Sequence, residues 1–170
     1  MTAHSETDIQ SRAKRVTLII MDCDGVLTDG RLFYSAAGEE LKVFNVRDGQ
    51  GIVDWHKAGF RSGIISGRKS PIVELRAKEL GIEFVMQGRN EKVSALNELI
   101  LAAGALREEV AYIGDDTPDA EVFPFVGLAV TVSDAHSTTK AAAHLVTDSP
   151  GGHGAVRELI DRILSAHRSE

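Results

Sequence analysis

The sequence is poor in features that whole classes of protein require. Its single cysteine, Cys23, excludes a disulfide within the chain, so a reducing compartment such as the cytoplasm is expected. No apolar run is long enough to span a bilayer, so no membrane contact is expected, and residues 1–15 show no hydrophobic signal segment. The net charge of −6 argues against a nucleic-acid partner, whose binding surface would need a basic patch.

What is present fits one soluble globular domain. The chain has 170 residues, of which 43% are hydrophobic and 26% are charged, and this is enough for a complete core. We interpret residues 1–15 as a flexible tail and residues 16–168 as a single domain. Because the chain is acidic, a pocket for an anionic substrate would have to be made locally positive by metal, lysine and helix N-termini.

One stretch, residues 18–30, organises the rest of the sequence. An apolar run typical of a strand buried on both faces ends in Asp22 and Asp24, and Gly25 then turns the chain. Open α/β sheets place their ligands at this end of a strand. Two close carboxylates repel unless a cation such as Mg²⁺ lies between them, and an aspartate can also be a nucleophile. The alternative is an acidic turn with no chemistry.

Further apolar runs alternate with helical patterns along the chain. We expect strands at 60–65, 82–86, 110–113, 127–132 and 145–146. This alternation predicts an α/β fold with a doubly wound parallel sheet. One segment departs from it: at about 30–46, two strand-like runs flank a turn containing Gly38 and predict a β-hairpin. The apolar content of this hairpin indicates that it packs against something else, such as another subunit.

Polar residues follow several of the predicted strands and should meet at one edge of the sheet. They are Asp22 and Asp24, Ser66, Lys92, and the acidic set Asp115, Asp116 and Asp119. Phosphoryl transfer needs such a set, namely a nucleophile, a proton donor, a cation and donors for the phosphoryl oxygens. Taken singly, the serine could be a helix cap, the lysine solvated and the acidic run a turn. Together and in this order they favour a catalytic site.

These motifs resemble those of the haloacid dehalogenase superfamily of phosphatases, and the resemblance covers about residues 16–165. It implies a Rossmann-like fold and a Mg²⁺ cofactor. It further implies that Asp22 attacks phosphorus and binds the metal. Asp24 would act as general acid and base, and its backbone carbonyl would also bind the metal.

The same resemblance gives roles to the remaining motif residues. Ser66 and Gly67 would bind the phosphoryl group, and Lys92 would neutralise the nucleophile and the phosphate. The other implied metal ligand is Asp115, supported by Asp116 and Asp119. The spaces between the motifs hold only the hairpin and one helix with one strand, so the chain resembles capless members, which often obtain cover by oligomerising.

Finer details resemble one capless branch, the 3-deoxy-D-manno-octulosonate 8-phosphate phosphatases. The matching segments are DGVLTDG (24–30), FNVRDG (44–49), ISGR (65–68), QG (87–88), GDD (114–116) and GGHGAVRE (151–158). The resemblance implies Mg²⁺-dependent hydrolysis of the eight-carbon sugar phosphate through an aspartyl-phosphate, a step toward a lipopolysaccharide sugar. It also implies a homotetramer whose hairpins help to cap neighbouring active sites.

The branch also suggests substrate-binding residues. Asn45, Arg47 and Asp48 would lie near the entrance of the site, and the Arg68 guanidinium could fork onto a sugar-acid carboxylate. The alternative for Arg68 is an exposed arginine at a helix start.

Two departures from the branch leave alternatives open. His153 stands where the branch usually has arginine, and Glu91 where it usually has asparagine. A sialic-acid-like nonulosonate 9-phosphate or another sugar phosphate is therefore the second candidate substrate. A non-catalytic oligomerisation domain is the third hypothesis, but such domains tend to lose the aspartates that this chain keeps.

Overall fold

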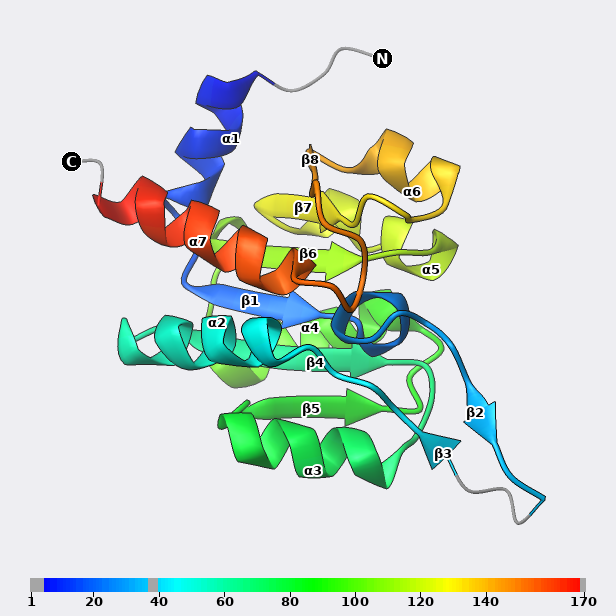
Figure 1. The fold of residues 1–170 in the computed structure, drawn as a ribbon. Coiled ribbons are helices and arrows are strands. Elements are labelled where there is room, and N and C mark those ends of the chain that lie inside the picture. Colours follow the sequence, from blue (N-terminus) through cyan, green and yellow to red (C-terminus); the bar gives the residue numbers. More distant parts are fainter. Residues whose placement is uncertain (1–4, 37–39, 169–170) are drawn as a thin grey trace.

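A computed structural model describes residues 5–36 and 40–168. Six parallel strands form one sheet in the order β5-β4-β1-β6-β7-β8 (Figure 1). Their bounds are β1 Leu18–Met21, β4 Arg61–Ser66, β5 Phe84–Gln87, β6 Val110–Gly114, β7 Leu128–Thr131 and β8 Leu145–Val146. The predicted doubly wound parallel sheet is confirmed, with β1 at its centre.

Strand β1 is central because each of its four residues is apolar and fully buried. It pairs in parallel with β4 and with β6, so that Leu18 lies opposite both Arg61 and Val110. Because side chains alternate along a strand, Ile19 and Met21 lie in the core on one face of the sheet. Leu18 and Ile20 lie in the core on the other face. A strand buried on both faces fixes where its carboxyl end, and hence Asp22, must lie.

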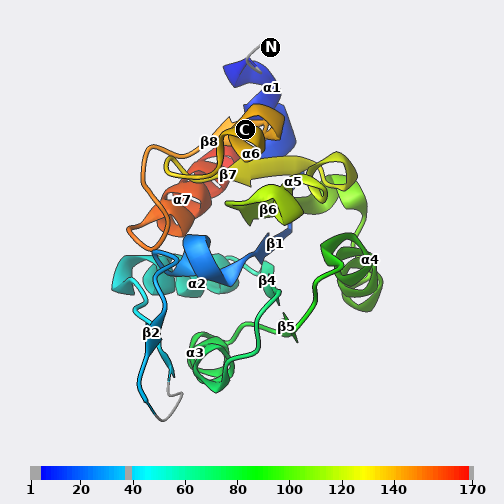
Figure 2. The same cartoon turned by 90° about the vertical axis from the view of Figure 1, so that its right-hand side faces the viewer.

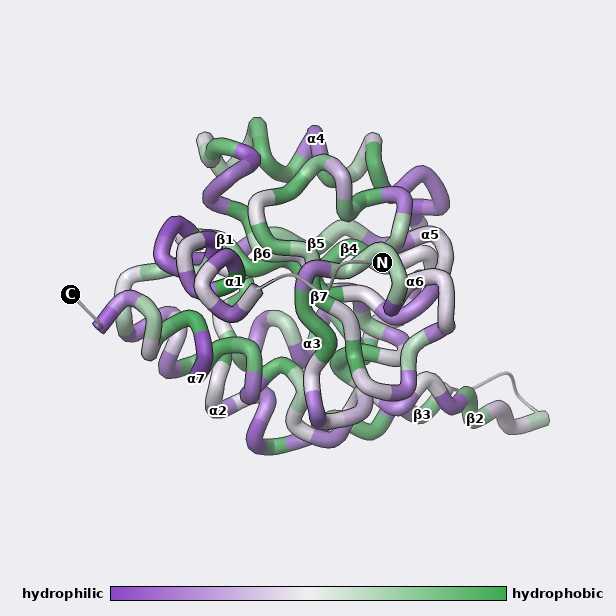
Figure 3. The backbone as a smooth tube through the Cα atoms, turned by 90° about the horizontal axis from the view of Figure 1, so that it is seen from above, coloured by the Kyte–Doolittle hydropathy of each residue, from purple (hydrophilic) through white to green (hydrophobic). Residues whose placement is uncertain are grey.

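Helices cover both faces of the sheet, as Figure 2 shows. One face packs against α1 (Glu6–Ala13), α2 (Val46–Lys57), α3 (Pro71–Leu80) and α7 (Ala155–Arg168). The other packs against α4 (Lys92–Ala103) and the short turn η3 (Phe123–Phe125). The remaining short helical elements are η1 (Cys23–Leu27), η2 (Arg107–Glu109), α5 (Thr117–Ala120) and α6 (Ser137–Ala142). Figure 3 shows hydrophobic residues concentrated along the strands between these layers.

The N-terminal segment differs from its prediction as a flexible tail. Residues 6–13 form helix α1, and Ser5 caps it by accepting a hydrogen bond from the Asp8 backbone N–H at 3.1 Å. Ile9 and Ala13 are buried in the core that α1 shares with α7. Arg12 donates to the Gly127 carbonyl at 2.8 Å. The tail prediction was wrong for this segment because two buried positions are too few to produce a recognisable apolar stripe; residues 1–4 lie outside the described residues.

Two short strands leave the main sheet between β1 and α2. Strands β2 (Phe33–Tyr34) and β3 (Glu40–Leu41) pair antiparallel and project beyond the carboxyl edge of the sheet (Figure 1). Residues 37–39, which include the predicted turn at Gly38, lie outside the described residues. Large apolar side chains stay exposed along this segment, namely Leu32, Phe33, Tyr34, Leu41 and Val43.

Among the described residues, none of the helices has both the length and the apolar character needed to cross a bilayer.

Candidate active site

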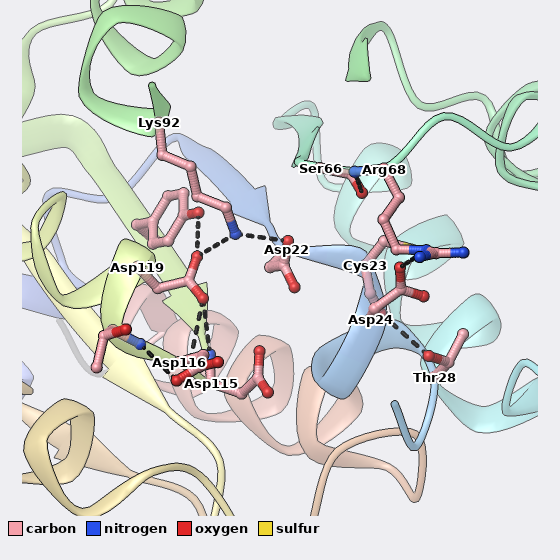
Figure 4. A network of polar contacts seen from close by, with 12 residues as sticks. Asp22, Cys23, Asp24, Thr28, Ser66, Arg68, Lys92, Asp115, Asp116 and Asp119 are labelled. Carbon is pink, nitrogen blue, oxygen red and sulfur yellow. Dashed lines mark hydrogen bonds and ion pairs between the residues drawn. The ribbon is translucent and has the colours of Figure 1, made fainter. Parts of the chain in front are cut away.

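The carboxyl edge of the sheet brings the predicted catalytic side chains together (Figure 4). Asp22 follows β1, Ser66 ends β4 and Asp115 follows β6, while Lys92 begins α4. These elements are neighbours in the sheet or pack directly on it, so residues as distant in sequence as Asp22 and Lys92 come into contact. The prediction that these strand ends converge is therefore confirmed.

Lys92 ties two of the carboxylates together. Its buried ammonium donates to Asp22 Oδ1 at 2.7 Å and to Asp119 Oδ1 at 2.6 Å. Burial alone would lower the pKa of Lys92, but the two adjacent carboxylates reverse this effect and raise it above its ordinary value. The lysine is therefore a permanent positive charge next to Asp22.

Asp119 links Lys92 and Tyr112 to the backbone of the turn after β6. Its Oδ1 accepts from Lys92 and, at 2.6 Å, from the hydroxyl of Tyr112, whose pKa burial raises well above its ordinary value. Its Oδ2 accepts from the backbone N–H groups of Asp115 and Asp116 at 3.2 and 3.1 Å. Both oxygens are thus already engaged within the protein, and support of a metal by Asp119 stays a prediction.

Three carboxylates crowd around this lysine. Oxygens of Asp22, Asp115 and Asp119 lie within 4.8 Å of one another, an arrangement that could hold a metal ion. Burial, followed by repulsion from Asp119, raises the pKa of Asp22 to about 7 although Lys92 opposes the shift. Burial, followed by repulsion from Asp22 and Asp119, raises the pKa of Asp115 to about 7 as well. One ammonium does not balance three carboxylates, so this cluster suits a further cation.

The three aspartates of the acidic turn, Asp115, Asp116 and Asp119, make different contacts. The Asp116 carboxylate accepts from the Thr117 N–H at 2.8 Å and caps α5, facing solvent instead of the cluster. With Asp119 engaged, Asp22 and Asp115 have carboxylates suited to a metal. Gly25 completes the fit: its φ of +101° favours glycine, and a Cβ there would collide with the Asp115 carboxylate.

Asp24 points away from the carboxylate cluster. It lies in the turn after β1, and its side chain faces Arg68 (Figure 4). Arg68 Nε lies 3.5 Å from Asp24 Oδ2, and the ammonium of Lys42 pairs with Asp24 Oδ1. Asp22 and Asp24 therefore occupy different surroundings, as two carboxylates with different tasks require. Metal binding by the Asp24 carbonyl stays a prediction.

The second predicted motif lies beside Asp24. Ser66 is buried at the end of β4, and its hydroxyl oxygen accepts from the Arg68 N–H at 3.3 Å, across Gly67. The Arg68 side chain donates to the Tyr34 hydroxyl at 2.6 Å, so β2 contacts the rim of the site. Binding of phosphate or substrate by these residues stays a prediction.

The entrance residues have mainly structural contacts. Asn45 caps α2 by accepting from the Arg47 N–H at 2.8 Å and donates to the Gly152 carbonyl at 3.3 Å. Asp48 accepts from the N–H groups of Gly154 and Arg157, at 3.2 and 2.8 Å, and burial raises its pKa. Its contacts therefore hold the start of α7 and do not support substrate binding by Asp48. The Arg47 side chain is exposed.

The glycine-rich segment at 151–154 packs against the turn that follows β1, where the Gly152 N–H donates to the Val26 carbonyl at 2.8 Å. His153 Nδ1 lies 2.7 Å from the Gly151 carbonyl.

Sequence reasoning missed three residues that contact the site residues, namely Lys42, Tyr34 and Tyr112. A lysine after a short strand and a tyrosine in an apolar run carry no motif, so only the folded chain reveals them.

Comparison with known proteins places this geometry in context. Residues 68–159 match a family described as haloacid dehalogenase-like hydrolase. The chain is 46% identical over 159 residues, 94% of this chain and 85% of the relative, to a 3-deoxy-D-manno-octulosonate 8-phosphate phosphatase from Yersinia pestis. The corresponding protein of Escherichia coli (strain K12) is 44% identical over 94% of this chain and 85% of its own length.

Solved structures agree with these relatives. The Yersinia pestis phosphatase superposes with a TM-score of 0.93 at 45% identity, covering 95% of this chain and 87% of that chain. A Moraxella catarrhalis phosphatase of the same name, in complex with a magnesium ion, a phosphate ion and a KDO molecule, gives a TM-score of 0.94 at 39% identity. That match covers 96% of this chain and 94% of the other.

Proposed function

The chain belongs to the haloacid dehalogenase-like hydrolases, in the group of 3-deoxy-D-manno-octulosonate 8-phosphate phosphatases, and on this premise we propose that it hydrolyses that sugar phosphate. It is a Mg²⁺-dependent phosphoric monoester hydrolase. The observation that carries this function is the contact of Lys92 with Asp22 inside the cluster of three carboxylates. An inert fold would have no reason to bury so much uncompensated charge.

The metal fits the carboxylates at the end of the sheet. Asp22 and Asp115 would hold Mg²⁺, because the oxygens of Asp119 are engaged with Lys92, Tyr112 and the turn. When bound, the ion supplies positive charge that offsets the carboxylates and the phosphate and keeps Asp22 ionised. Lys92 supplies a further positive charge at Oδ1 of Asp22.

We propose that this chain's own residues carry out the reaction in two steps. An oxygen of Asp22 attacks phosphorus, and the bond from phosphorus to the sugar oxygen breaks as Asp24 gives its proton to that oxygen. Ser66 donates a hydrogen bond to the phosphoryl group, and Lys92 offsets its charge. Asp24, now ionised, takes a proton from water as the water attacks phosphorus, releasing phosphate and restoring Asp22.

The substrate follows from the relatives, and Arg68 is the residue we assign to its carboxylate. The test measures phosphate release from octulosonate 8-phosphate and from a nonulosonate 9-phosphate, with Mg²⁺ and with EDTA. We expect Mg²⁺-dependent release that favours the eight-carbon acid and is abolished in Asp22→Asn. Preference for the nine-carbon acid would move specificity toward His153. Release equal to that of Asp22→Asn would support a non-catalytic oligomerisation domain instead.

We also propose that the protein is a homotetramer in which the β2–β3 segment contributes to the contacts. Support comes from the apolar side chains that this segment leaves exposed and from a neighbouring groove on α2 and α3, lined in part by Val46, Ile72 and Leu75. Light scattering after size exclusion tests this, with Leu41→Asp expected to dissociate the assembly. A wild-type monomer would contradict it. A cytoplasmic location stays a prediction from the single cysteine.

A further inference from the structure

Lys42 makes an unusual contact for a residue next to a projecting pair of strands. It lies directly after β3, yet only 2% of its side chain is exposed. Its ammonium pairs with Oδ1 of Asp24, eighteen residues earlier in the chain. Burying a lysine is costly unless an anion is placed to receive it, so this contact is specified by the fold.

The two carboxylate oxygens of Asp24 differ in their hydrogen-bond partners. Oδ1 accepts from Lys42, whereas Oδ2 is buried and has no hydrogen-bond partner among the residues that the structure describes. Arg68 Nε, at 3.5 Å, is too far from Oδ2 to hydrogen-bond to it. A buried oxygen left without a partner is the one to which an incoming group can bind.

From these contacts we propose that Lys42 is a positioning residue for the hydrolysis, which fixes Asp24 so that Oδ2 faces the leaving oxygen. This inference rests on the proposed phosphatase function. An ammonium has three donors and no acceptor, so an oxygen bonded to it can only accept. The proton that Asp24 exchanges with the substrate is therefore carried on Oδ2.

With the proton on Oδ2, each bond that forms in the hydrolysis is matched by a bond that breaks. As the Asp22–phosphorus bond forms and the phosphorus–sugar oxygen bond breaks, the proton on Oδ2 passes to the sugar oxygen. Asp24 is left as a carboxylate whose Oδ1 still accepts from Lys42. In the second half, Oδ2 takes a proton from the attacking water, and the aspartyl-phosphate bond breaks.

The β2–β3 segment also contacts the active site of its own chain. Lys42 contacts Asp24, and Tyr34 accepts a hydrogen bond from Arg68 at 2.6 Å. Strand β2 and the residue directly after β3 thus each place one side chain at the rim of the same site. Cover of a neighbouring active site would be a separate role of the same segment.

The experiment compares two leaving groups in Lys42→Met, Lys42→Arg and the matched control Lys78→Met, which removes an exposed lysine from α3. The quantity is kcat/KM, because it reports the step in which the leaving group departs. A sugar alkoxide needs a proton, whereas the nitrophenolate of p-nitrophenyl phosphate departs without one. We expect Lys42→Met to lose about 100-fold on octulosonate 8-phosphate, mostly in kcat, and less than about 10-fold on p-nitrophenyl phosphate.

Two further comparisons separate positioning from general damage. Lys42→Arg should restore at least part of the loss, since a guanidinium can also donate to Oδ1. In an Asp24→Asn background, Lys42→Met should cost nothing more on p-nitrophenyl phosphate, because the lysine acts through Asp24. Lys78→Met should match the wild type in both assays.

Several results would overturn the proposal. They are equal losses on the two substrates, no loss on either, or a further loss in the Asp24→Asn background. If Lys42→Met does not fold, the ratio of the two substrates in Lys42→Arg decides instead. Failure of the proposed function would look different, because the wild type itself would then release no phosphate from the sugar substrate.

Discussion

Removal of the divalent cation should make the stability of this protein fall as pH rises, because of Asp22. Its pKa is raised from 3.8 to about 7 in the folded chain by burial and by Asp119. Between these two values the folded state holds a proton that the unfolded state has released, so the free energy of unfolding decreases with increasing pH. The contribution is fully present below about pH 4 and is lost as pH approaches 7.

The size of this effect follows from the same difference. A pKa raised from 3.8 to about 7 corresponds to about 4 kcal/mol for the buried Asp22 carboxylate. That is a large part of the roughly 5–15 kcal/mol that stabilises an ordinary domain. Bound Mg²⁺ should flatten the dependence, because the cation takes over the role of the proton between the carboxylates.

Urea unfolding followed by Trp55 fluorescence measures this directly. Trp55 is the single tryptophan, is fully buried and stacks on Phe60, so its emission reports loss of the core. The wild type and Asp22→Asn should be compared between about pH 5 and pH 8, in EDTA and in Mg²⁺. Asp48, whose pKa is also raised, contributes equally to both proteins and cancels in the difference. Asp115 does not cancel, because repulsion from Asp22 is one cause of its raised pKa, so the difference reports this pair of carboxylates.

The comparison can refute the reasoning in two ways. In EDTA, the stability of Asp22→Asn relative to the wild type should increase by about 2–3 kcal/mol between pH 5 and pH 8, because the rest of the roughly 4 kcal/mol is lost below pH 5. If the difference in free energy of unfolding between the two proteins stays constant with pH, the folded state does not raise the pKa of Asp22. An equal pH dependence in EDTA and in Mg²⁺ would mean that the cation does not bind at this cluster.

Three further substitutions probe the surroundings of the site. Gly25→Ala should weaken Mg²⁺ binding, measured by calorimetry, because its Cβ would displace the Asp115 carboxylate; unchanged affinity would contradict this. Asp48→Ala should lower the free energy of unfolding by about 1–2 kcal/mol through loss of two backbone hydrogen bonds at α7, and an effect on KM alone would instead restore a substrate role. Arg68→Lys should raise KM about 10-fold for the sugar acid and leave p-nitrophenyl phosphate unaffected, whereas equal effects would remove Arg68 from carboxylate binding.

The sheet and the catalytic cluster could be predicted because their signals are local. Four buried apolar residues in β1 define a central strand, and parallel topology then brings the ends of β4 and β6 beside it. Asp22 and Lys92 meet for this reason, although 70 residues separate them. Here the hydrophobic pattern determines the backbone, and the backbone determines the site.

Other features depend on contacts that no pattern encodes. Helix α1 owes its place to Ile9 and Ala13 against α7, a contact between the two ends of the chain. Asp48 stands in a segment that resembles a substrate-binding motif, yet its carboxylate holds the start of a helix more than 100 residues away. Lys42 reaches Asp24 only because of how β3 is placed. In each case the chemistry of the residue was evident but its partner was not.

The charges of the site imply that cation and phosphate bind cooperatively. Around Lys92 lie the carboxylates of Asp22, Asp115 and Asp119, so when all are ionised the cluster is negative before any phosphate arrives. A phosphate monoester would add further negative charge at a buried position, where repulsion is screened least. A divalent cation removes that barrier, and by linkage the phosphate must then tighten the cation by the same factor. An acidic chain can thus bind an anionic substrate because its affinity for phosphate is created together with its affinity for the metal.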